Sequence, residues 1–483
     1  MADRVQASVH ARLYILVETG AEHGVSDAEL RNGAPDGFDQ PGNVCASDGS
    51  LGTAPAIQAA QEGKVPQAKS IKAPKKKAVE VTAAIESTLT QDERAYDPYL
   101  RGREYLRRSH SFENLTLAQT AFDEAIAADP AFAQAHAGLC EAFLGQYQLH
   151  RENLPFVLAQ KACAQALTLD PELVEVNLSL GALYRVSGDY AQALENLDTA
   201  RVAAPDNAEV YTQLGHTLDR LGRGADAEDA YIQAVALEPG FWGVYVDLAN
   251  YYYTHAEYAK ALELFERTLV MAGTERATVQ HSIATVQLAT GAFQKALQTY
   301  ETVLRETGTP RRSTLTNLGM VNYYLGCYED AARWQQRALQ LAPRDHRLIG
   351  RLAESCRFLP DGERHARTLW ATAIAAQSRE QNQADWESQG LIAIYHAHRG
   401  EMDAARGALQ VMWALEPEPS TAHYFEAIVT TKAGGDATAA RMLALDHGFP
   451  PALIDNDPDL HPPPACPLPR EPLAAAAACI LDK

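Results

Sequence analysis

The 483-residue chain is poor in the features that mark disulfide-rich, zinc-binding and membrane proteins. Its seven cysteines are scattered and never form a C-x-x-C pair, a spacing that fits neither a disulfide framework nor a zinc site. No apolar run approaches the roughly 18 residues of a membrane span, and LYILV near the N-terminus is too short for a signal-peptide core. These absences predict a protein of the reducing cytoplasm that has no membrane partner.

Basic residues are also scarce. The chain has 42 lysines and arginines against 62 aspartates and glutamates, which gives a formal net charge of -20. A surface with this balance repels phosphate backbones. Nucleic acid is therefore excluded as an expected partner, and a protein or peptide is favoured.

Catalytic motifs are missing as well. The sequence contains no G-x-S-x-G, no P-loop and no H-E-x-x-H, and HREN at His150 lacks the other elements of a kinase. His396 and His398 lie on different sides of an expected helix, which is a poor geometry for a metal. We expect no enzyme activity, no catalytic residue, no metal site and no cofactor.

Three regions differ in composition. Residues 1–93 are rich in Gly, Ala, Asp and Gln and show no sustained period, so they are predicted to be disordered or a linker. Their cluster KSIKAPKKKAVE is interpreted as solvated linker, with an electrostatic contact as the alternative. Residues 94–447 have a helical pattern throughout, and 448–483 form a terminal segment and proline-rich tail.

One decapeptide recurs in the middle region. GDYAQALENL is followed by GRGADAEDAY, AEYAKALELF, GAFQKALQTY and GCYEDAARWQ, at intervals of 34, 34, 35 and 35 residues. Apolar or small residues recur within each at three- and four-residue steps, which indicates the start of a helix. The five copies begin at Gly188, Gly222, Ala256, Gly291 and Gly326.

A small residue lies twelve positions before the central alanine of each copy, in a second helical pattern. One repeat is therefore predicted to be two helices, with small side chains where the axes come closest. A proline follows the second helix in several units and ends it, for example Pro171, Pro205 and Pro239. The positions assigned this structural role are Gly181, Ala193, Gly215, Ala227, Ala261, Ala296, Gly319 and Ala331.

This pattern resembles the tetratricopeptide repeat (TPR), whose period is 34 and which joins leucine-glycine, tyrosine, alanine, an aromatic residue and a proline. Leu180, Gly181, Tyr184, Ala193 and Pro205 form the clearest copy, and weaker units flank it on both sides. The resemblance covers about 350 residues. It implies an all-α fold: a right-handed α-solenoid of about nine to ten stacked helix-turn-helix units with disordered termini.

Stacked hairpins of this kind form a concave face that is lined by the first helix of each unit and binds a peptide or protein segment. If the small residues face the second helix, their neighbours project into this face. The lining is neutral and hydrogen-bonding, although Tyr253 and Tyr323 are equally well explained as packing residues. The predicted peptide-binding residues are Thr212, His216, Asn250, Tyr253, His281, Thr285, Asn317 and Tyr323.

Chaperone-binding members of the family use lysine, asparagine and arginine to hold a C-terminal carboxylate. The predicted lining has no lysine, and among charged residues only Arg347, Arg351 and Arg357 near the far end offer comparable charge. A carboxylate-binding site in the middle repeats is therefore not expected.

A narrower resemblance concerns AYDPYLRGREYL, AFAQAHAGLCEAF and GFPPALIDNDPDL. These segments are similar to the C-terminal TPR region of large bacterial signalling proteins, where it follows a Ser/Thr protein kinase, an adenylate cyclase or a sensor domain. Two functions stay open. The chain is either a cytoplasmic, non-enzymatic scaffold that binds a protein segment, or a regulatory module that acts on, or is detached from, a signalling enzyme.

Overall fold

The computed structural model describes residues 92–108, 111–150, 153–308, 311–378, 385–462, 464–467 and 479. All regular secondary structure in these residues is helical, so the all-α prediction is confirmed. No helix among them is both long and apolar enough to cross a membrane. The segment predicted to be a disordered linker lies outside the described residues, up to residue 91.

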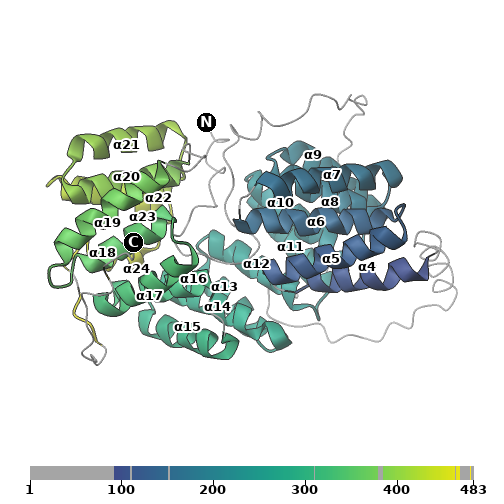
Figure 1. The fold of residues 1–483 in the computed structure, drawn as a ribbon, viewed down its shortest axis with the longest axis horizontal. Coiled ribbons are helices and arrows are strands. Elements are labelled where there is room, and N and C mark those ends of the chain that lie inside the picture. The colour runs from purple at the N-terminus through teal and green to yellow at the C-terminus, as the bar shows by residue number, and fades with distance from the viewer. Residues whose placement is uncertain are drawn as a thin grey trace. The chain divides into compact units, whose positions relative to one another are not determined.

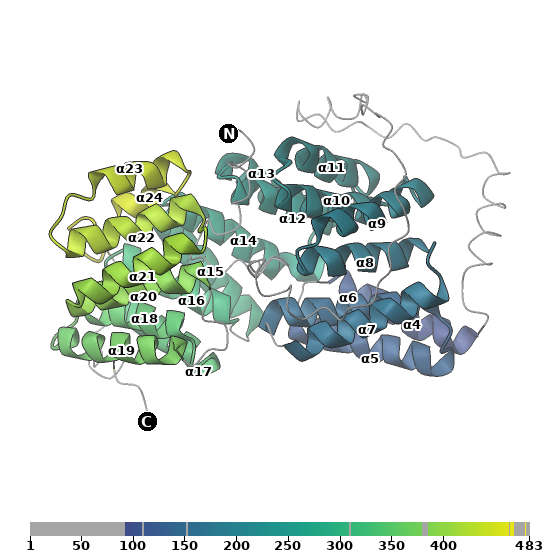
Figure 2. The same ribbon diagram turned by 90° about the horizontal axis from the view of Figure 1, so that it is seen from above.

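The chain divides into two compact units, and the boundary between Asp247 and Leu248 falls inside a helix, α12. The N-terminal unit is described from residue 92 onward (Figures 1 and 2). Its helices are α4 (Glu93–Leu106), α5 (Phe112–Ala128), α6 (Ala133–His150), α7 (Asn153–Leu169), α8 (Val174–Val186), α9 (Tyr190–Ala203), α10 (Ala208–Arg220), α11 (Gly224–Leu237) and the first part of α12 (Trp242–Thr254).

The C-terminal unit holds the remaining described residues, beginning with the second part of α12. Its helices are α13 (Tyr258–Thr268), the short 3₁₀ helix η1 (Gly273–Glu275), α14 (Arg276–Ala289), α15 (Phe293–Thr307), α16 (Arg312–Tyr324), α17 (Tyr328–Leu341), α18 (His346–Cys356), α19 (Gly362–Gln377), α20 (Trp386–Arg399), α21 (Met402–Ala414), α22 (Pro419–Lys432), α23 (Thr438–Asp446) and α24 (Pro451–Asp455).

Helices pack as hairpins in chain order. Each even-numbered helix from α4 to α22, α12 apart, packs most closely on the helix that follows it, and Figure 1 shows this pairing along the chain. α12 and α13 are joined by the same kind of short turn. The described residues therefore contain ten helix hairpins, which confirms the predicted number of about nine to ten.

The turn inside each repeated hairpin explains why the decapeptide begins as it does. Gly188, Gly222, Gly291 and Gly326 have φ between 70 and 83°, the left-handed region, and Ala256 takes the same place with φ 60°. The backbone N–H of the next residue donates to the carbonyl five positions back, as Asp189 does to Tyr184 at 2.9 Å. This bond satisfies a carbonyl that the end of the first helix leaves open.

Small residues lie where the two helices of a hairpin meet. A Cβ atom on Gly181 would lie 2.7 Å from Cγ of Leu197, and one on Gly215 would lie 2.7 Å from the ring of Tyr231. A side chain at either position would collide with its neighbour. The alanines of the second helices are completely buried; they are Ala193, Ala227, Ala261, Ala296 and Ala331.

Prolines close the hairpins as predicted. Pro171, Pro205 and Pro239 each lie two residues beyond the last residue of a second helix. Their carbonyls then accept a hydrogen bond from the side chain six residues later, on the next hairpin. The donors are Asn177 at 2.9 Å, Tyr211 at 3.0 Å and Tyr245 at 3.1 Å. The proline therefore ends one helix and anchors the next.

The second hairpin differs from the others in length. The additional residues near YQLHRENLPF extend its helices, so that α6 has 18 residues and α7 has 17, against 13 and 14 in α8 and α9. The terminal segment also has a defined place. Residues 448–467, with residue 463 not described, follow α23 and lie against the C-terminal unit; we call them the tail.

Candidate functional site

Charged side chains gather on the first helices of the N-terminal unit. Arg103 on α4 donates to Glu141 on α6, with Nη1 3.1 Å from Oε2, and to Glu209 on α10, with Nη2 2.7 Å from Oε2. Burial raises the pKa of Glu141 to about 8, although the charge of Arg103 opposes this shift. The guanidinium of Arg103 and its two carboxyl partners are therefore partly shielded from water. Removing one partner would leave the other without its main polar contact.

A second charged group lies in the same unit and shares α10 with the first. Nε2 of His216 on α10 lies 3.7 Å from Oδ1 of Asp247 on α12, and the hydroxyl of Tyr231 lies 2.8 Å from Nδ1 of His216. Burial raises the pKa of Asp247 to about 7 and lowers the pKa of Arg185 to about 10. We call the surface made by Arg103, Glu141, Arg185, Glu209, His216 and Asp247 the charged face.

The eight predicted peptide-binding residues occupy two kinds of position. Thr212, His216 and Asn250 are partly exposed. The other five are buried by their neighbours, and their exposed fractions lie between 0 and 7%: Tyr253, His281, Thr285, Asn317 and Tyr323.

Three of the buried residues belong to one hydrogen-bonded network. The hydroxyl of Tyr300 lies 2.8 Å from Oγ1 of Thr285 and accepts from Nδ2 of Asn317 at 2.9 Å. His281 in turn lies 3.1 Å from the hydroxyl of Thr314. These bonds join α14, α15 and α16, so the network links neighbouring hairpins.

A second concentration of charge surrounds the tail. Oδ1 of Asp459 lies 2.5 Å from Nη2 of Arg357, the residue that caps the C-terminal end of α18, and 2.7 Å from Nζ of Lys432 on α22. Its other oxygen lies 3.1 Å from Nε2 of His398 on α20. We call these four side chains the tail site. Burial alone would raise the pKa of Asp459, but the charges of its three partners outweigh it and hold that pKa well below its usual range.

A second aspartate of the tail is also buried. The hydroxyl of Tyr424 donates to Asp457, which is 2% exposed. Burial raises the pKa of Asp457 to about 7, and the neighbouring charge of Asp459 adds to this shift. The remaining space is a cavity of about 40 Å³ that is lined by both aspartates together with Tyr323, Tyr424 and Phe449. The tail fills its site almost completely.

Sequence reasoning identified one residue of the tail site. Arg357 was noted as a source of positive charge, whereas His398, Lys432 and Asp459 were not assigned a role there. One feature of the sequence points to the tail site. The segment GFPPALIDNDPDL follows the helical region and combines apolar residues, which favour burial, with Asp457 and Asp459. Because no period relates the tail to the repeats, its docking position could not be read from the sequence.

The prediction that the cysteines stay unpaired is wrong. Cys140 pairs with Cys163 across α6 and α7, Cys327 pairs with Cys466, and Cys356 pairs with Cys479. Cα–Cα distances of 5.3, 4.7 and 5.9 Å lie in the range that a disulfide spans. Sequence spacing does not reveal these pairs, because the paired cysteines are 23, 139 and 123 residues apart in the chain.

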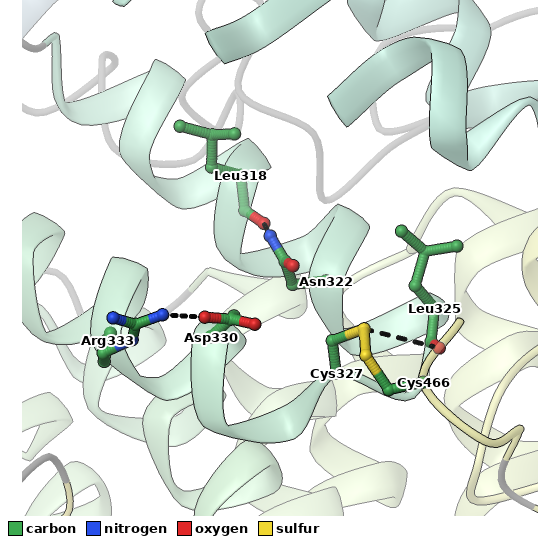
Figure 3. The surroundings of a disulfide bond; sticks show 7 residues. All are labelled: Leu318, Asn322, Leu325, Cys327, Asp330, Arg333 and Cys466. Carbon is green, nitrogen blue, oxygen red and sulfur yellow. Dashed lines mark hydrogen bonds and ion pairs between the residues drawn. A yellow bond between two sulfur atoms is a disulfide. The ribbon is translucent and has the colours of Figure 1, made fainter. Parts of the chain in front are cut away.

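Figure 3 shows the pair that joins the tail to the turn between α16 and α17. Cys327 comes directly after Gly326, the left-handed residue of that turn. Two of the three disulfides therefore attach the tail, or the residue at 479 beyond it, to the C-terminal unit. The expectation of a reducing compartment was based on unpaired cysteines, and the three disulfides remove that basis.

In the described part of the chain, no group of three or more His, Cys, Asp or Glu side chains is arranged to hold a metal ion. The charged face and the tail site instead pair acids with bases.

Comparisons with known families identify the repeat. Two models described as tetratricopeptide repeat match the chain, one at residues 178–228 and 212–277 and the other at residues 313–345. Tetratricopeptide repeats are therefore present in both units. A comparison with curated proteins found no match.

Solved structures of similar fold include PilF of Pseudomonas aeruginosa, at 19% identity and a TM-score of 0.33 over 44% of this chain and 94% of that one. Yeast Tom70 matches at 18% identity and a TM-score of 0.45, over 65% and 66%. A tetratricopeptide repeat protein from Parabacteroides merdae matches at 15% and 0.37, over 55% and 99%.

Proposed function

We propose that this chain is a non-enzymatic scaffold that holds a segment of another protein on the charged face of its N-terminal unit. Tetratricopeptide repeats indicate a protein-interaction scaffold in general. The proposal that the charged face is the binding surface rests on the exposure and the pKa of its ionisable side chains. His216 and Asp247 each keep 29% of their side chains exposed, although burial has already shifted the pKa of Asp247 to about 7.

A bound ligand would change the protonation of such partly exposed side chains. A donor from a bound segment would stabilise the Asp247 carboxylate, and the partly exposed Thr212 lies on α10, the helix that also carries His216. Five of the eight residues first predicted for this role are buried between hairpins, so they would support the fold more than contact a partner.

Site-specific photo-cross-linking tests this proposal. A photoreactive amino acid replaces Thr212 on α10 in the full chain, and a matched protein carries it at the exposed Asp229 on α11. After irradiation in extract of the source cells, mass spectrometry identifies the cross-linked proteins. We expect one partner to be captured from position 212 and not from position 229. Equal capture from both positions would place binding elsewhere.

The regulatory alternative rests on the resemblance to TPR regions of bacterial kinases and cyclases. It requires the captured partner to be such an enzyme and the enzyme's activity to change when this chain is added. A partner without catalytic activity would contradict it.

We also propose that the protein works in an oxidising compartment and not in the cytoplasm. Three disulfides support this proposal, because such bonds persist where thiol reductants are scarce. Alkylation of thiols at the moment of cell lysis tests it. Protection of these six cysteines from the alkylating reagent is expected, whereas rapid labelling of all of them would restore the cytoplasmic assignment.

A further inference from the structure

The tail lies across successive hairpins of the C-terminal unit. Gly291, in the turn between α14 and α15, faces Ala452 so closely that a Cβ on the glycine would lie 2.7 Å from Cβ of the alanine. Gly326, in the turn between α16 and α17, approaches the backbone of Pro464 in the same way. Further along, the tail reaches α18, α20 and α22 through Asp459. It therefore spans five hairpins in the manner of a bound segment.

Both apolar and charged contacts bind the tail to the hairpins. Leu453 and Ile454 are 2% exposed, and the ring of Phe449 stacks on Tyr424 with centroids 4.3 Å apart. Asp459 supplies the anion that Arg357 and Lys432 need, because these two cations converge on a single buried carboxylate. If the tail left, the two cations would lose this partner, and an acidic group from elsewhere would restore the pairing.

The tail has little structure of its own. The only helix in the described residues of the tail, α24, has five residues, and a helix of that length does not persist in water without a surface to pack on. Covalent bonds compensate for this weakness. Cys466 and Cys479 follow Asp459 in the chain. Their bonds to Cys327 and Cys356 close loops of 139 and 123 residues, the kind of loop for which a cross-link contributes most.

We propose that the tail is an intramolecular ligand that two disulfides hold in a binding site for acidic protein segments. A dithiol reductant that reaches this otherwise oxidising compartment opens the site. Each disulfide takes up two electrons and two protons and becomes two cysteine thiols, while the reductant's two thiols become its own disulfide. The released tail is then replaced by a partner segment that presents an aspartate to Arg357, His398 and Lys432. This inference extends the proposed scaffold function to a second, regulated surface.

Hydrogen exchange on the full chain tests whether the two disulfides hold the tail in its site. The Cys466→Ser/Cys479→Ser protein is used because a reductant would also open Cys140–Cys163. We expect amides of residues 449–462 to exchange at least ten-fold faster than in the parent, while α16–α22 stay protected. Unchanged exchange in the tail would overturn the proposal. Loss of protection throughout α16–α22 would also overturn it, because the tail would then be part of the core.

Peptide binding tests the specificity of the site. The probe is a labelled peptide of residues 448–462, and the receptor is the full chain with both cysteine changes and Asp459→Asn, which weakens its own tail. A matched receptor carries Asp455→Asn, which removes an exposed aspartate from the same segment. We expect the probe to bind the first receptor at least ten-fold more tightly than the second, whose tail still competes.

A second probe, with Asn in place of Asp459 in the peptide itself, should bind at least ten-fold more weakly than the native probe. Equal affinity of the two probes, or no binding to a receptor whose α16–α22 remain protected, would overturn the assignment of the site to acidic segments. Neither measurement involves the N-terminal unit, so failure here is distinguishable from failure of cross-linking at position 212.

Discussion

At the scale of single residues, the turn inside each repeated hairpin shows how one backbone angle selects an amino acid. Four of the five decapeptides begin with glycine, and the five starting residues have φ between 60 and 83°. A residue with a Cβ atom pays roughly 1 kcal/mol or more in this region, whereas glycine does not. Ala256 is the exception and is therefore a local weakness of the fifth hairpin.

Replacing Ala256 by glycine should therefore stabilise the protein. We expect a gain of about 0.5–1 kcal/mol, which is the relief of the left-handed strain less the extra entropy that glycine gives the unfolded chain. Urea unfolding followed by circular dichroism measures the change. The reverse substitution Gly222→Ala, at φ 70°, should cost about 1 kcal/mol. A loss of stability in Ala256→Gly would contradict the argument.

At the scale of elements, the hairpin depends on small side chains between its two helices. Ala261 on α13 is completely buried, as are the equivalent alanines of the other repeated hairpins. Packing at such a point leaves no room for additional methylene groups. The small residues in the sequence pattern therefore mark the positions where the two helices of a hairpin come closest.

Enlarging Ala261 to leucine should overpack the fifth hairpin. We expect the free energy of unfolding to fall by about 1–3 kcal/mol, measured as a shift of the urea midpoint. Ala259→Leu, on the exposed side of the same helix, is the matched control and should change stability by no more than about 0.5 kcal/mol. If both variants unfold at the same urea concentration, Ala261 does not lie at the helix contact.

At the scale of the whole molecule, buried charges and disulfides link residues that the sequence keeps far apart. Arg103 reaches Glu209 across 106 positions, and Cys327 reaches Cys466 across 139. These long-range connections give the two units properties that no single repeat has: a stability that depends on pH and a stability that depends on redox state.

Glu141 should make the N-terminal unit more stable in mild acid. The folded state takes up a proton near pH 8, whereas the group's ordinary pKa is 4.5, so its stabilising contribution is present at low pH and is lost as the pH rises to about 8. Between about pH 8 and pH 6, the parent should gain on the order of 1–2 kcal/mol relative to Glu141→Gln. Urea midpoints at both pH values measure this, and parallel pH profiles would refute it.

The disulfide inside the second hairpin should contribute to the stability of the N-terminal unit. Cys140 and Cys163 are 23 residues apart, and a loop of this length corresponds to about 3 kcal/mol in the chain-entropy model. Cys140→Ser/Cys163→Ser should therefore unfold at lower urea, and a non-reducing digest of the parent should contain the linked peptide. A parent digest with both cysteines as free thiols would sink this prediction.

Much of the architecture follows from local chemistry and could be predicted. Pro171, Pro205 and Pro239 end helices because proline lacks an N–H, and Gly181 allows a close helix contact because it lacks a Cβ atom. The candidate site was harder. Asn317 was placed on an open face on the basis of spacing, but its side chain donates to Tyr300 between hairpins. Spacing gives the face of a helix, not what the neighbouring hairpin covers.

The sequence by itself determined the helices, the hairpins and their number, because helix periodicity, turn residues and helix-ending prolines act over a few residues and repeat at a fixed interval. The tertiary structure alone decided the pairing of six cysteines, the charged face and the docking of the tail. These features depend on which residues the packing brings within a few ångströms across 23 to 139 positions of chain. Such proximity follows from the packing of the hairpins within each unit, and it leaves no period in the sequence.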